Sequence, residues 1–169
     1  MSNRSTKYAA AVTMVELLLA LAITGLLLAA VAVAFNASII NYRENEDIFK
    51  TINNARQALF RITNQLRTAD AVDPNAPANE CTLFTDDGDH ITYRYNNGDN
   101  KLYLITNDDL SDSDYVLCDN VTAMTCTKDT VIDEDMQIKV KNVQISITVV
   151  SGNIQQTLSA AAVVRKNLE

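Results

Sequence analysis

The chain has 169 residues, which leaves room for one soluble head of roughly 100 residues beside an N-terminal helix, and for no second domain. Its net charge of −7 argues against direct nucleic-acid binding, because phosphate contacts need clustered Lys and Arg. No spacing joins a nucleophile to a base or a metal to an open position, and His90 is the single histidine, so we do not expect an enzyme.

An apolar run follows a short basic segment at the start of the chain. Residues 17–35 carry no charge, and at about 1.5 Å per residue they nearly cross a hydrocarbon core about 30 Å thick. The run predicts a transmembrane helix over residues 12–35, with the N-terminus in the cytoplasm because Arg4 and Lys7 precede it. A cleaved secretory signal ending near Ala30-Val31-Ala32 is the competing interpretation, but the run exceeds a signal core of roughly 7 to 15 residues.

Glu16 places a carboxylate at the start of this apolar run. The eleven Leu, Ile, Val and Phe side chains of residues 17–35 outweigh the insertion cost of one acidic group, so the helix still inserts. An ionisable side chain within a span indicates a functional site and needs a partner. The alternative is that Glu16 extends to the headgroups and has no specific role.

A known family shares the pattern around Glu16. The segment Ala11-Val12-Thr13-Met14-Val15-Glu16-Leu17-Leu18-Leu19-Ala20 resembles the processing and assembly segment of type IV pilins and type II secretion pseudopilins. The resemblance implies that a prepilin peptidase removes residues 1–11 as a leader, cutting between Ala11 and Val12, and that the new Val12 amine is methylated. The family usually has Gly before the cut and Phe after it, where this chain has Ala11 and Val12.

In family terms, Glu16 becomes the fifth residue of the mature chain, where these proteins carry their membrane carboxylate. Opposite charges attract strongly where the dielectric constant is low. The Val12 amine of an incoming subunit is therefore expected to pair with Glu16 of a subunit already in the filament, which would register the two axially.

An amphipathic helix is predicted over residues 36–70, continuous with the membrane helix because neither Pro nor Gly interrupts it. Apolar residues recur there at alternating spacings of four and three, which is one helical stripe. We expect the stripe to pack on the protein's own sheet, and a coiled coil is the alternative. The stripe consists of Ile48, Ile52, Ala55, Leu59, Ile62, Leu66 and Ala69.

Residues 71–169 are predicted to form an antiparallel sheet of about four to six strands, after Pro74 and Pro77 end the helix and open a connector. Strands are expected at 91–95, 101–106, 115–118, 121–127, 136–150 and 154–164, with a hairpin turn at 96–100 and another at 151–153. The fold class is therefore α+β, a long N-terminal α-helix packed on a C-terminal antiparallel β-sheet. The segments 116–122, 143–150 and 158–168 resemble the ending of W-class minor pilins and J-type minor pseudopilins, which typically close with a strand that runs into an Arg-Asn pair. In this chain Lys166 interrupts that pair.

Three cysteines lie in the predicted head, which would face an oxidising compartment where disulfides persist. Cys118 and Cys126 flank a turn and are candidates for a disulfide, although Cys81 with either of them remains open, as does a core of three free thiols. Acidic turns around Gly88 and at 108–114 and 133–135 suggest calcium as an alternative cofactor, but none has the spacing of a calcium loop, so we expect no cofactor and no metal site.

Together these features predict a minor pilin or pseudopilin, held in the inner membrane with its head in the periplasm until it joins a filament. Its expected partners are other pilin or pseudopilin subunits, the prepilin peptidase, the inner-membrane assembly platform and membrane lipid. The alternative is an unprocessed membrane-anchored binding module whose head recognises a ligand.

Overall fold

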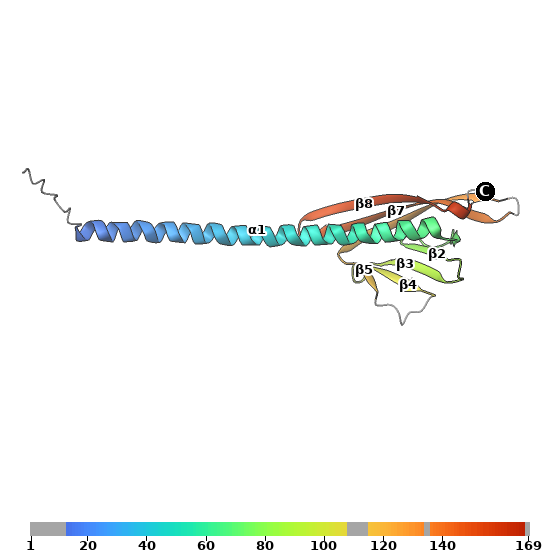
Figure 1. Cartoon of the computed structure of the whole chain (residues 1–169), viewed down its shortest axis with the longest axis horizontal. Helices are drawn as coiled ribbons and strands as arrows, with labels where there is room; N and C mark the ends of the chain where they lie inside the picture. The colour runs from blue at the N-terminus through green and yellow to red at the C-terminus, as the bar shows by residue number, and fades with distance from the viewer. Residues whose placement is uncertain (1–12, 108–114, 134–135, 168–169) are drawn as a thin grey trace, which may run out of the picture. The chain divides into compact units, whose positions relative to one another are not determined.

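A computed structural model describes residues 13–107, 115–133 and 136–167 of the chain (Figure 1). It divides into two compact units, Met1–Arg43 and Glu44–Glu169. One helix, α1 (Met14–Thr68), provides the regular structure described for the first unit and also opens the second. The predicted continuity of the helix is confirmed, and α1 ends two residues before the predicted boundary at Asp70.

Within the described ranges, eight strands follow the helix, and every pairing between them is antiparallel. The first five form one sheet in the order β1-β2-β3-β4-β5, and the last three form another in the order β6-β7-β8. A short 3₁₀ turn, η2 (Arg165–Asn167), follows β8. The strands are β1 (Ala71–Val72), β2 (Glu80–Phe84), β3 (His90–Asn96), β4 (Lys101–Thr106), β5 (Val116–Cys118), β6 (Val121–Ile132), β7 (Ile138–Ser151) and β8 (Ile154–Val163).

The α+β prediction is confirmed, and two details of the sheet differ from it. There are two sheets rather than one, because the chain turns at Asn120 (φ +56°) and β6 then pairs with β7 while β5 pairs only with β4. The first sheet also gains β1 and β2 from a stretch that the two prolines marked as a connector. The predicted β3–β4 and β7–β8 hairpins are present, and Gly152 supplies the left-handed φ of +59° in the second turn.

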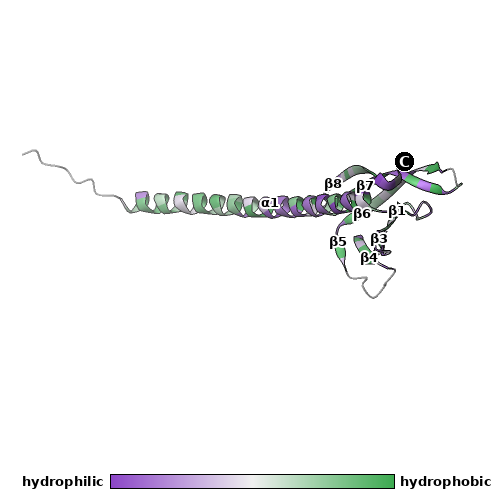
Figure 2. Ribbon diagram, turned by 45° about the vertical axis from the view of Figure 1, so that its right-hand side comes forward, coloured by the Kyte–Doolittle hydropathy of each residue, from purple (hydrophilic) through white to green (hydrophobic). Residues whose placement is uncertain are grey.

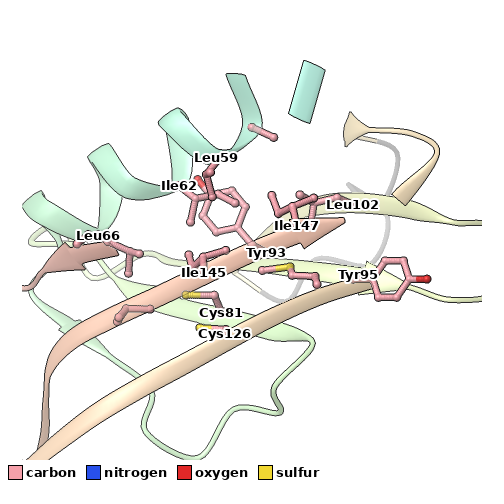
Figure 3. Close-up of a cluster of buried hydrophobic side chains, with 14 of the residues drawn as sticks. Leu59, Ile62, Leu66, Cys81, Tyr93, Tyr95, Leu102, Cys126, Ile145 and Ile147 are labelled. Carbon is pink, nitrogen blue, oxygen red and sulfur yellow. The ribbon is translucent and has the colours of Figure 1, made fainter. Parts of the chain in front are cut away.

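One hydrophobic core unites α1 with both sheets. The helix buries Ala55, Ala58, Leu59, Ile62 and Leu66, which lie in the same cluster as side chains of β2, β3, β4, β6 and β7. Figure 3 shows Leu59, Ile62 and Leu66 facing strands of the two sheets. The predicted apolar stripe is therefore buried in the protein's own core from Ala55 to Ala69, as expected, whereas its first two members, Ile48 and Ile52, are half-buried.

The last residues of the described chain are held against the end of α1 and the five-stranded sheet. Lys166 donates a hydrogen bond to Asp70 at 2.7 Å and also pairs with Asp86. The hydrogen bonds to Asp70 and Asp86 raise the pKa of the Lys166 ammonium. Lys166 therefore connects the C-terminal turn to two other parts of the head.

Tyr93 carries the one phenol that is fully buried among the described residues. Its hydroxyl donates to the side-chain carbonyl of Gln65 on α1, which joins β3 to the helix. Burial raises the pKa of Tyr93, so the hydroxyl remains a donor at neutral pH.

Tyr93→Phe should lower the free energy of unfolding by about 1 kcal/mol, because it removes one hydrogen bond and leaves the Gln65 oxygen without that donor. Urea unfolding of the wild type and the variant measures the difference. In the wild type, stability should also fall as the pH rises above about 10, because the unfolded tyrosine ionises first. An unchanged midpoint in Tyr93→Phe would show that this hydrogen bond contributes nothing to the head.

Candidate functional site

The candidate site is the apolar first part of α1. No residue from 17 to 42 is charged, and every side chain from Thr13 to Asp47 is exposed. Figure 2 shows this apolar part of α1 and the more hydrophilic helix that follows it. Among the described residues, α1 is the one helix long and apolar enough to cross a membrane. Exposed apolar surface of this extent requires a lipid or protein environment.

Hydroxyl groups within the apolar part of α1 are satisfied by the helix itself. Thr24 Oγ1 donates to the Ala20 carbonyl at 2.7 Å, and Ser38 Oγ donates to the Ala34 carbonyl at 2.9 Å. Such bonds within one helix are what a lipid environment demands, because hydrocarbon offers no partner to a polar group. These two hydroxyls therefore do not oppose membrane insertion.

Glu16 belongs to a capping box at the start of α1. Its Oε2 accepts hydrogen bonds from the Thr13 backbone N–H at 2.9 Å and from Thr13 Oγ1 at 3.0 Å. The Glu16 backbone N–H in turn donates to Thr13 Oγ1 at 3.3 Å. This reciprocal arrangement satisfies donors at the helix end that have no partner within the helix. In the single chain, the carboxylate thus already has a structural role.

The sequence contains a local signal for this box, although the role predicted for Glu16 was assembly with another subunit. Thr13-Met14-Val15-Glu16 has the spacing of Thr at the cap and Glu three residues later, directly before an apolar run. The predicted processing residues Ala11 and Val12 lie outside the described residues, and so does the Val12 amine expected to pair with Glu16. The pairing of that amine with Glu16 stays a prediction.

The cysteines form a second feature of the head. All three are free and buried. The side chains of Cys81 and Cys126 lie close enough to interact, whereas Cys118 donates to the Asp119 carbonyl at 3.3 Å and pairs with Leu102 in the register of β4 and β5. Burial raises the pKa of the Cys118 thiol to about 12.

The acidic turns were the alternative sites for calcium. Within the described ranges, no group of three or more His, Cys, Asp or Glu side chains is arranged to hold a metal ion. Around Gly88, Asp86 pairs with Lys166 and Asp89 Oδ1 accepts from Asn107 Nδ2 at 2.7 Å. Residues 108–114 and 134–135, which carry most of the other acidic side chains of these turns, lie outside the described residues.

In comparisons with known proteins, no family model, curated protein or solved structure matches this chain. The functional interpretation therefore depends on the residues and contacts of the chain itself.

Proposed function

We propose that this chain is a minor pilin or minor pseudopilin, a structural subunit of a type IV pilus or a type II secretion filament. The observation that carries the proposal is an exposed helix with no charge from residue 17 to 42 and a single carboxylate, Glu16, at its start. An ionisable side chain at the start of a span indicates a functional site, and in an assembling subunit this carboxylate can recognise a neighbour as well as cap its own helix.

In this proposal, removal of residues 1–11 creates a positive amine on Val12 close to the membrane surface. An unpaired charge in a medium of low dielectric constant is costly, and a carboxylate of another subunit relieves that cost. Glu16 would exchange its hydrogen bonds with Thr13 for a contact with the amine of the next subunit. Only one axial position of the two helices brings these groups together, so the pair selects the correct docking position.

The proposal also assigns an environment to each part of the chain. The apolar part of α1 lies in lipid before assembly and among the helices of other subunits afterwards, which covers its exposed side chains in both states. The head, which buries its own core, stays outside the bilayer. The basic start of the chain favours a cytoplasmic N-terminus and a periplasmic head.

The direct test is intact mass and N-terminal peptide mapping of the protein from its native membrane, with and without the prepilin peptidase. We expect a chain that begins at methylated Val12 when the peptidase is present and retains residues 1–11 when it is absent. Retention of residues 1–11 in both strains would contradict the proposal and would favour an anchored binding module that is never processed.

A further inference from the structure

Two thiols meet where the two sheets of the head join. Cys81 lies in β2 of the five-stranded sheet and Cys126 in β6 of the three-stranded sheet, and both side chains are buried. The two thiols belong to the same buried cluster and each perturbs the pKa of the other. Figure 3 shows the two sulfur-bearing side chains next to each other within this cluster.

The backbone on both sides fixes this proximity. The Cys126 N–H donates to the Ala78 carbonyl at 2.7 Å, three residues before Cys81 in the chain. Two residues after Cys126, Lys128 Nζ donates to the Ala76 carbonyl at 2.5 Å. β6 is therefore anchored to the segment that leads into β2, so the two thiols do not depend on one side-chain rotamer to come together.

We propose that Cys81 and Cys126 form an intramolecular disulfide that covalently joins the two sheets of the head. Its formation in cells rests on the proposed function, which places the head in an oxidising compartment where disulfides persist. Cys118 is left as the single free thiol, consistent with its burial and with its hydrogen bond to Asp119.

The oxidant required is a disulfide carrier, either an oxidised thiol:disulfide oxidoreductase or oxidised glutathione. A thiolate of the pair attacks one carrier sulfur, which breaks the carrier's S–S bond, forms a mixed disulfide and releases one carrier thiolate. The second cysteine, as its thiolate, then attacks the protein sulfur of the mixed disulfide and releases the other carrier thiolate. The two cysteines lose two protons and two electrons in total, and the carrier is reduced to two thiols.

In the folded head the two thiols differ in acidity. The interaction with Cys81 holds the pKa of Cys126 below its usual value against the effect of burial, and the positive charge of Lys128 also lowers it. The same interaction, together with burial, raises the pKa of Cys81. Because the folded core excludes a carrier, we expect the reaction during folding, after β6 has met the segment before β2 and before α1 covers the junction.

The cross-link would close a loop of roughly 45 residues, which restricts the unfolded chain. From the usual stabilisation by disulfides, we expect oxidation to shift the folding equilibrium toward the native head on the order of a hundredfold.

The test uses the purified full chain in detergent micelles, reduced and denatured, then refolded in a mixture of oxidised and reduced glutathione. After quenching and unfolding, the remaining thiols are alkylated and counted by intact mass, and the linked peptides are mapped. We expect one alkylated thiol, Cys118, and a linked peptide pair that contains Cys81 and Cys126. Cys118→Ala is the matched control and should retain the cross-link, whereas Cys81→Ala and Cys126→Ala should each leave two alkylated thiols.

Three alkylated thiols in the refolded wild type, or a cross-link that includes Cys118, would overturn the proposal. The peptide map of the wild type decides the pairing even if a variant of Cys81 or Cys126 does not fold. Because the reaction is carried out on purified protein, its outcome is independent of leader removal. If the disulfide forms but residues 1–11 are never removed in cells, the disulfide proposal stands and only the filament proposal is contradicted.

Discussion

Glu16→Ala should leave the head folded and the helix inserted in the membrane while incorporation into filaments falls by at least about tenfold. The expected loss follows from the proposed pairing, because an incoming Val12 amine would meet no carboxylate in a medium of low dielectric constant. The measurement is the amount of subunit in sheared filaments, or the secretion that depends on them, relative to the amount in the membrane fraction.

Two further variants separate the proposed assembly contact from the capping box. Glu16→Gln keeps a side-chain oxygen that can accept from Thr13, but it removes the charge, so it should fail in assembly as Glu16→Ala does. Thr13→Ala removes the capping hydroxyl and keeps the carboxylate, so it should still assemble. Leader removal is checked by mass in each variant, since these residues adjoin the proposed cleavage site.

Normal filaments in Glu16→Ala would remove the proposed role of the carboxylate altogether. Normal filaments in Glu16→Gln together with failure of Glu16→Ala would show instead that Glu16 acts through the cap. In that case the helix start would need its hydrogen bonds, and the amine of a neighbouring subunit would not need a charge.

The sequence predicted best those elements whose signals are local. Residues 48–69 repeat their apolar positions at helical spacing, and the structure buries that stripe in the core from Ala55 onward. The turn at 96–100 separates two alternating segments, and β3 and β4 pair as expected, with Asn96 opposite Lys101. In both cases the pattern that predicts the element lies within a short stretch of chain.

The features that the sequence left open depend on contacts between distant segments. β2 spans five residues after a proline-containing stretch, and it becomes a strand because β3 offers a partner from Glu80–Arg94 to Phe84–His90. The choice of Cys81 over Cys118 as the neighbour of Cys126 likewise depends on how two sheets pack, which no spacing of cysteines encodes. The capping box is different, because its signal is local. It was not predicted because Glu16 was interpreted as a carboxylate that pairs with another subunit.

Leu66→Ala should lower the free energy of unfolding of the head by about 2–5 kcal/mol, the usual cost of truncating a fully buried leucine. Leu66 has no exposed surface and lies in the core with strands of both sheets, so its removal leaves a cavity that close packing does not easily fill. Pulse proteolysis of the full chain in urea and detergent measures the change in the free energy of unfolding. Cleavage at sites within the head reports on the unfolding of the head alone.

Phe60→Ala on the same helix is the matched control. The Phe60 side chain is 68% exposed, so the substitution should change stability by no more than about 0.5 kcal/mol, although it removes more atoms than Leu66→Ala does. A comparable loss in the two variants would mean that α1 presents a different face to the sheets. If neither variant lost stability, the apolar stripe would have to be covered by another chain, which would restore the coiled-coil alternative.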